Sequence, residues 1–378
     1  MPMMKKVLII GLLAVLTTVI MARDSLQTVP VNELALQDSS IRQKPKHSWL
    51  KRTIRGFSHI DTNYVEPQHY DWAVMVQGTY SYDYYRLRSA GKNRQSVAFA
   101  PSPTIKFGPY FGWRWIFLGY TFDLRNLHIG NKSEKQEFDF SIYSAQIGCD
   151  LYYRRTGSDY KITHANLDSH IDKRQLNHVA FNGISVGITG ISLYYIFNHQ
   201  RFSYPAAFAQ STCQKISCGS WMAGLGYLRN SLDFDHQKFE QLVSERTHQE
   251  VQIDSGLMFN SVKYTDVNAS VGYAYNWVFA PRWLFCSSLS LALAYKYSEA
   301  ETSEIKRFNI DNFNIDGIGR FGLVWNNTRW FAGLSAIVRV YNYHKSGFAA
   351  SNIFGSLNVY AGYNFGLKKK YRKGRIKR

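Results

Sequence analysis

The feature that most constrains the fold is a period-two alternation of apolar with small or polar residues, which recurs between Pro281 and Phe365. Successive side chains of a β-strand point to opposite faces, so the alternation predicts strands with one apolar face. The pattern returns after an Asn326-Asn327 turn, at 330–340, and again at 353–365. In the first segment the apolar face carries Trp283, Phe285, Leu289, Leu291, Leu293, Tyr295 and Tyr297, and the other face carries Cys286, Ser288, Ser290, Ala292, Ala294 and Lys296.

The side chains on the second face of these strands are too small to fill the core of a soluble sheet. Transmembrane barrel strands are about ten residues long, apolar outward, polar inward, and flanked by aromatic girdles. Trp283 and Tyr295 lie at the two ends of one segment, where girdle residues belong. Unpaired backbone groups cannot face lipid, so we predict an all-β fold: an antiparallel transmembrane β-barrel of about 12 strands over residues 59–367. A secreted soluble β-sandwich is the alternative.

The composition agrees with a barrel. The chain has 378 residues, of which 16% are aromatic, yet its mean hydropathy is only −0.28. No internal apolar run reaches the eighteen or so residues of a membrane helix, as expected for strands that cross a membrane.

The N-terminal region has the pattern of an export signal. Two lysines precede an apolar run that ends at Ala22, which predicts a signal peptide at 1–22 and a place in the bacterial outer membrane; an uncleaved anchor helix is the alternative. Residues 23–58 are polar and read as a flexible leader. Within it, Trp49 to Phe57 has the spacing of a short amphipathic helix, or else forms a loosely packed turn.

Positive charge is concentrated at the end of the sequence, within a net charge of +18. A basic tail at 368–378 is either a solvated arm or a segment held by anionic lipid headgroups or an anionic periplasmic partner. We expect no nucleic acid partner for an exported chain. Cys213 and Cys218 are close enough in sequence to form a disulfide bridge across a loop; free thiols are the alternative.

Several strand boundaries and loop positions also follow from the pattern. It predicts a tight turn at Gly108-Pro109, one continuous strand from Phe138 to Arg154, and two separate strands at Ile253–Val262 and Ala269–Val278. If short turns face the periplasm, the long connections at 156–177 and 231–251 are expected on that same side.

Three blocks resemble a known family: "FAPSPTIKFGPYFGWRWIFLGYTFDL", "FDFSIYSAQIGCDLYYRRTGSDYKI" and "RFSYPAAFAQSTCQKISCGSWMAGLGY". They are similar to an uncharacterised family of outer-membrane barrels of Bacteroidetes-type bacteria, the domain of unknown function 4421. The resemblance covers about His59 to Phe365. It implies barrel architecture and outer-membrane location, and it brings no activity.

Two short motifs match enzyme signatures but lack their structural context. Residues 183–187 read G-x-S-x-G around Ser185, and 317–322 read G-x-G-x-x-G. Each needs a helix directly after the motif, whereas here the strand pattern continues. The sequence has no zinc-type spacing of His and Cys, so we expect no metal and no cofactor.

The segment from His199 to Ser220 gathers the remaining chemistry-bearing side chains. A serine activated by a histidine at a barrel rim would serve a lipid hydrolase or acyltransferase; the alternative is an ordered loop that folds inward. The catalytic candidates are His199, Ser211, Ser217 and Ser220, and the ligand-binding candidates are Tyr204, Gln210 and Gln214.

Two functions remain open. The favoured hypothesis is a non-enzymatic pore, scaffold or envelope-interaction module, because no acidic partner lies near His199 and no compact catalytic motif is present. The other is an enzyme that modifies outer-membrane lipid or lipopolysaccharide through the 199–220 loop. Lipid or lipopolysaccharide is the expected partner in either case.

Overall fold

The computed structural model describes residues 60–89, 94–113, 116–119, 122–123, 136–156, 159–167, 173–298, 313–345 and 347–372. All of them belong to one compact unit, Ile60–Arg378. The predicted signal peptide at 1–22, the leader at 23–58 with its amphipathic segment, and residues 373–378 of the basic tail lie outside the described residues.

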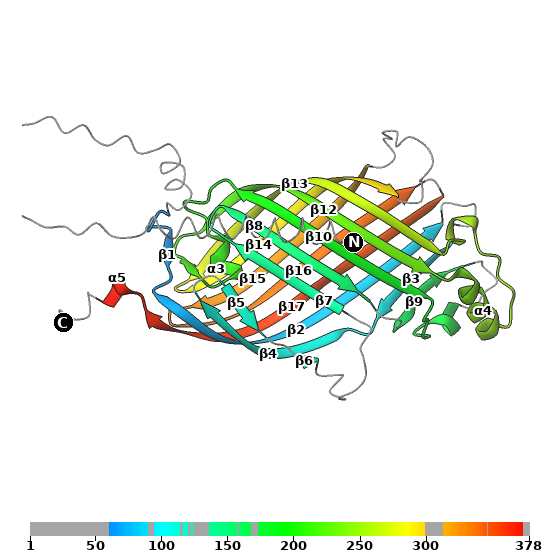
Figure 1. The fold of residues 1–378 in the computed structure, drawn as a ribbon, viewed down its shortest axis with the longest axis horizontal. Coiled ribbons are helices and arrows are strands. Elements are labelled where there is room, and N and C mark those ends of the chain that lie inside the picture. Colours follow the sequence, from blue (N-terminus) through cyan, green and yellow to red (C-terminus); the bar gives the residue numbers. More distant parts are fainter. Residues whose placement is uncertain are drawn as a thin grey trace, which may run out of the picture. The chain divides into compact units, whose positions relative to one another are not determined.

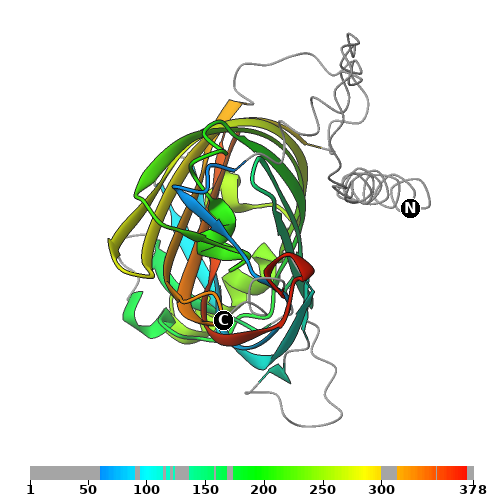
Figure 2. The same cartoon turned by 90° about the vertical axis from the view of Figure 1, so that its left-hand side faces the viewer.

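The main sheet of the unit is antiparallel, and twelve of its strands follow each other edge to edge and curl around a lumen (Figures 1 and 2). This arrangement confirms the predicted barrel of about 12 strands. In sheet order the strands are β5 (Ile116–Gly119), β4 (Thr104–Trp113), β2 (Tyr70–Ser89), β17 (Phe348–Leu367), β16 (Trp330–Lys345), β15 (Phe313–Asn326), β14 (Trp283–Ser298), β13 (Ser261–Ala280), β12 (Cys218–Phe234), β10 (Ile184–Ile196), β8 (Ile147–Arg155) and β7 (Gln136–Tyr143).

The first long strand pairs with the last one. β2 and β17 form a ladder that runs without a break from Trp72↔Phe365 to Ser89↔Phe348 and has one further pair at Tyr70↔Leu367. Within the described residues no ladder joins β5 to β7; here the walls are linked by an ion pair between Lys106 of β4 and Glu137 of β7, at 2.8 Å.

The strands expose their apolar side chains outward, as the alternation predicts. On β14, Leu289, Leu291 and Leu293 are 61%, 54% and 55% exposed, whereas Cys286 and Ala294 are fully buried on the inner face. Such a band of exposed aliphatic and aromatic side chains would be costly in water and matches the lipid-facing surface of a transmembrane barrel.

Shorter elements occupy the ends and the interior of the barrel. Among the described residues no helix is long and apolar enough to cross a bilayer. The remaining elements are β1 (Val65–Pro67), β3 (Ser96–Pro101), β6 (Phe122–Asp123), β9 (Tyr160–Asn166), β11 (Thr212–Gln214), α3 (Tyr204–Phe208), α4 (His236–Thr247), α5 (Lys369–Arg372) and the 3₁₀ turns η1 (Lys173–Leu176) and η2 (Ser255–Leu257). A separate two-stranded sheet is formed by β1 and β11.

The two ends of the barrel differ (Figure 1). The α3 end holds α3, β1, β11, α5 and the turns at 281–282 and 327–329; the α4 end holds α4, β3, β9, η1 and η2. The described parts of the connections 156–183 and 235–260 both lie at the α4 end, because Ile184 pairs with Phe234 there. The expectation that the long connections share a side with the short turns is therefore wrong.

Three strand boundaries also need correction. Gly108-Pro109 is not a turn but lies within β4, where Pro109 pairs with Val76 of β2 and with no residue of β5 or β6 on its other side, an edge position of the kind where proline is tolerated. The predicted strand 138–154 is a hairpin, β7 and β8, whose turn is closed by Ser144 Oγ accepting from Ile147 N at 2.9 Å. The segment 253–278 holds η2 and a single strand, β13.

Candidate functional site

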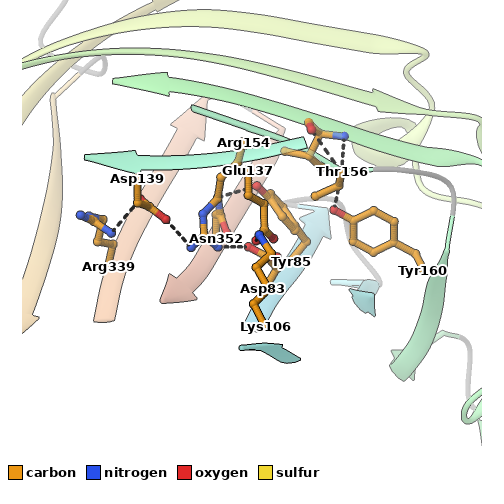
Figure 3. Close-up of polar contacts among 11 residues, drawn as sticks. Asp83, Tyr85, Lys106, Glu137, Asp139, Arg154, Thr156, Tyr160, Arg339 and Asn352 are labelled. Atoms are coloured by element: carbon orange, nitrogen blue, oxygen red, sulfur yellow. Dashed lines mark hydrogen bonds and ion pairs between the residues drawn. The ribbon is translucent and has the colours of Figure 1, made fainter. Parts of the chain in front are cut away.

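Charged side chains meet inside the lumen and join strands that are not neighbours in the sheet (Figure 3). Nη1 of Arg154 on β8 donates to Oδ1 of Asp83 on β2 at 2.8 Å, and its Nη2 donates to Oδ2 of Asp139 on β7 at 3.3 Å. Oδ1 of Asp139 lies 3.9 Å from Nη1 of Arg339 on β16. The Arg154 side chain is only 2% exposed. These pairs tie β7 and β8, at one edge of the sheet, to β2 and β16 across the lumen.

A second group of charges joins three neighbouring strands of the barrel wall. Nζ of Lys296 on β14 is 3.2 Å from Asp266 on β13 and 2.8 Å from Asp316 on β15, and it donates to the backbone oxygen of Asn342 at 2.7 Å. All three charged side chains are 1% exposed or less.

Two arginines reach further across the lumen. Arg320 of β15 pairs with Asp150 of β8, and Arg339 of β16 pairs with Asp139 of β7. The Arg339 guanidinium also lies 4.8 Å from the ring centre of Tyr152, and that of Arg154 lies 4.8 Å from the ring centre of Phe354. Buried charges are tolerated only when they are paired and hydrogen-bonded, and removal of one partner from such a pair costs about 3–5 kcal/mol. Ion pairs thus cross the middle of the lumen.

Residues 197–217, between β10 and β12, fold back into the α3 end of the lumen; we call this segment the plug. Its helix α3 begins where Pro205 presets a helical backbone angle. In Figure 2 the helix, drawn in green, lies inside the ring of strands. Its apolar side chains pack onto β10, β12, β14 and β15 in a core of Phe202, Tyr204, Ala206, Ala207, Tyr194, Ile196, Met222, Ala274, Leu284, Cys286 and Val324.

Hydrogen bonds fasten the plug to the barrel wall. Tyr204 Oη donates to Ser288 Oγ at 3.0 Å, and Gln210 Nε2 donates to Tyr360 Oη at 2.7 Å. Asn276 Nδ2 donates to Gln214 Oε1 at 3.0 Å. The three predicted ligand-binding residues therefore hold the plug in place.

A polar cavity of about 680 Å³ lies between the plug, the inner wall and β7. Charged side chains of both signs line it, together with hydroxyl and amide groups from β2, β16 and β17. Its lining includes Lys106, Glu137, Asp139, Arg320, Arg339, Gln77, Thr79, Asn358, Phe208 and Gln210.

A family model described as Domain of unknown function (DUF4421) matches residues 59–365. The chain belongs to the DUF4421 family. The matched range agrees with the span over which the three sequence blocks resemble that family.

Solved structures similar to this DUF4421 chain include the outer membrane protease OmpT from Escherichia coli, with 8% identity and a TM-score of 0.31; the alignment covers 78% of this chain and 97% of that one. The beta domain of the Bordetella autotransporter BrkA has 12% identity and a TM-score of 0.29, over 78% and 99% of the two chains. The P. putida toluene transporter TodX has 7% identity and a TM-score of 0.24, over 79% and 91%. No curated protein matches the sequence. Similarities this low say nothing of the activity of the DUF4421 chain.

The four catalytic candidates of the DUF4421 chain are not brought together. Neither ring nitrogen of His199 has a hydrogen-bond partner among the described residues. Ser220 Oγ accepts from Asn198 N at 2.9 Å and donates to Trp221 O, while Ser217 Oγ accepts from Val278 N at 2.9 Å. Ser211 accepts from Gln68 N through its backbone oxygen. Two of these hydroxyls thus bind backbone groups of the plug and the adjoining strands.

The remaining sequence candidates are also placed. Ser185 lies within β10 opposite Asp233 of β12, and Gly317–Gly322 lies within β15, so neither short motif leads into a helix. Cys213 and Cys218 are free thiols. In the part of the chain that the structure describes, no three His, Cys, Asp or Glu side chains gather where they could hold a metal ion.

Proposed function

We propose that this chain is a non-enzymatic barrel of the bacterial outer membrane that works with a closed lumen, as a scaffold that presents its two folded ends to the envelope. The outward band of apolar side chains supports the membrane location. Of the three non-enzymatic roles considered, an open pore has the least support.

The observation that carries this proposal is that folded segments and ion pairs obstruct the lumen at both ends and in the middle, around the polar cavity beside the plug. The plug occupies the α3 end and is bonded to β14 and β17. Ion pairs around Arg154 and Arg320 cross the middle. At the α4 end, an apolar core joins the inner faces of the strands to β3, β9 and α4. Porins, by contrast, keep a water-filled interior.

Single-channel recording tests the closed lumen. The full chain, purified and reconstituted into planar bilayers, should show no steady conductance, with a known porin as the positive control. A second variant, in which residues 203–211 are replaced by a Gly/Ser linker, should also stay closed, because the core at the α4 end still fills the lumen. Steady ohmic current through the unmodified barrel would contradict the scaffold proposal and favour a pore.

The enzyme hypothesis has less support. A general base must lie within hydrogen-bond reach of the hydroxyl that it activates, and His199 makes no such contact with Ser217 or Ser220. Loss of a measured lipid hydrolase activity in both His199→Ala and one of Ser211→Ala, Ser217→Ala or Ser220→Ala would favour the enzyme.

A further inference from the structure

An apolar groove runs along the outer face of the barrel near the α3 end. Its volume is about 650 Å³, and strands β4, β2, β17 and β16 form it. The groove is hollow here because the outward residue of β17 between Val359 and Tyr363 is the small Ala361, which pairs with Val76. Its lining includes the exposed rings of Phe111, 49% exposed, and Trp330, 54% exposed. We call it the Ala361 groove; its other lining residues are Val74, Met75, Pro109, Tyr110, Gly362 and Tyr363.

One end of the Ala361 groove carries a fixed positive charge. Arg329 Nε donates to the hydroxyl of Tyr363 at 2.9 Å, and the guanidinium lies 5.2 Å from the centre of that ring. Tyr363 is itself a lining residue of the groove and packs on Trp330, with 4.5 Å between ring centres. The guanidinium is therefore held directly beside the groove.

The backbone of the turn holds Arg329 in this position. Asn327 Oδ1 accepts from Arg329 N at 3.1 Å and from Trp330 N at 2.7 Å, and Asn364 N donates to Arg329 O at 2.7 Å. Arg329 is exposed and makes no ion pair with any of the described residues. A guanidinium has five N–H donors, so donors remain for an anionic ligand after Nε and Nη2 both donate to the Tyr363 hydroxyl.

The depth of the groove in the bilayer follows from the turns. Short turns of such barrels face the periplasm, and the turns at 281–282 and 327–329 both lie at the α3 end. Trp330 and Tyr363 then belong to the periplasmic aromatic girdle, level with lipid headgroups. The helix α5, with exposed Lys369 and Lys370, follows β17 at the same end (Figure 1).

We propose that the Ala361 groove binds one anionic phospholipid of the periplasmic leaflet, with an acyl chain in the groove and the phosphate on Arg329. The apolar lining matches the chain, and the guanidinium matches a phosphodiester by charge and geometry. A lipid that occupies the hollow and also pairs with the fixed cation is retained when its neighbours exchange. The site goes beyond the scaffold role and does not depend on a closed lumen.

Native mass spectrometry of the detergent-solubilised full chain tests the site with added phosphatidylglycerol and, separately, phosphatidylethanolamine. One phosphatidylglycerol should remain bound per barrel, with clear preference over phosphatidylethanolamine. Arg329→Gln should weaken phosphatidylglycerol retention about fivefold, the change expected for one basic residue at headgroup level. Ala361→Phe should fill the groove and abolish retention of either lipid.

Matched controls separate the site from general lipid coating. Arg282→Gln removes a cation from another turn at the same end, and Ala269→Phe adds an aromatic ring to an exposed position on β13; both should retain phosphatidylglycerol like the unmodified barrel. Heat-modifiability on gels confirms that each variant is folded. Equal retention in Arg329→Gln and the unmodified chain, equal loss in Ala269→Phe and Ala361→Phe, or retention of phosphatidylethanolamine equal to that of phosphatidylglycerol would each overturn the proposal.

Discussion

The two ends of the barrel are closed by different means. At the α4 end, twenty-seven buried residues from the barrel strands, β3, β9, η1, η2 and α4 form one continuous core. At the α3 end the closure is a single loop, with eleven buried residues in its core, and side-chain hydrogen bonds to the wall. Elements with few apolar contacts open at a lower free energy than the core of a protein. The α4 end should therefore unfold only with the barrel, whereas the plug can open alone.

The largest effect is expected from Phe99→Ala, in the core of the α4 end. Phe99 is fully buried and stacks on Phe181, with 5.4 Å between ring centres. Truncation of a buried Phe typically costs about 3–5 kcal/mol, and here the loss should lower the free energy of unfolding of the whole barrel. Urea unfolding in detergent micelles, followed by Trp fluorescence, measures it. Phe279→Ala, on a residue that is 45% exposed on the outer face, is the control; similar losses in both would contradict the division between the ends.

The next largest loss of stability is expected from a charge on the outer face of the wall between the two ends. Leu291→Arg places a charge on an outward side chain of β14 and should destabilise the barrel by roughly 2–4 kcal/mol if it faces lipid near the midplane. Leu291→Phe keeps the position apolar and should be nearly neutral. The readout is the urea midpoint in lipid vesicles. A midpoint for Leu291→Arg equal to that of Leu291→Phe would mean that this face of the wall does not meet lipid.

Tyr204→Ala should affect only the α3 end. Tyr204 is fully buried and packs on Phe208, with 4.8 Å between ring centres. Because the plug opens independently, its loss should speed hydrogen exchange of 199–216 while the exchange of 236–257 and the urea midpoint change little. Mass spectrometry of exchanged peptides resolves the two regions. Faster exchange in both would show that the ends are coupled.

The smallest effect concerns the thiol of Cys213, on the β11 strand of the plug. Burial raises the pKa of this thiol to about 12, so almost no thiolate is present at pH 8. Iodoacetamide at pH 8 should leave Cys213 unmodified in the unaltered chain and modify it slowly in Tyr204→Ala, as read from the alkylated peptide. Rapid labelling of the unaltered chain would mean that the plug is already open.

The sequence was informative wherever one strand alone decides the outcome. Alternation along β14 identifies the exposed and buried faces without reference to any other strand, and the structure agrees for Leu291 and Cys286. The hairpin at 144–146 was missed because its turn contains no Gly, Pro or Asn; Ser144 supplies the capping oxygen instead. The correct strand total depended on two errors that cancelled, since 138–154 holds two strands and 253–278 holds one.

The inward position of the lumenal charges can be predicted from the sequence, but their pairing cannot. Asp83, Arg154 and Arg339 fall on the inner face by parity, so a charged interior could have been inferred from the alternation. Their pairing could not, because Asp83 and Arg154 lie on strands that are not neighbours in the sheet. The inward fold of the plug was one of the two predictions for the 199–220 loop, but its bonds to Ser288 and Tyr360 depend on a register that no local pattern contains.

The ladder between β2 and β17 sets a condition on how the protein is assembled. Its two strands come from opposite ends of the described chain, so the pairing closes a very long loop and is expected to form slowly. Until β17 arrives, β2 and β16 each lack the neighbour that completes the sheet, and unpaired strand edges recruit other chains. The sheet therefore closes correctly only if β17 is exported before β2 and β16 pair with other chains. A product that ends before Phe348 would carry two unpaired strand edges into the membrane.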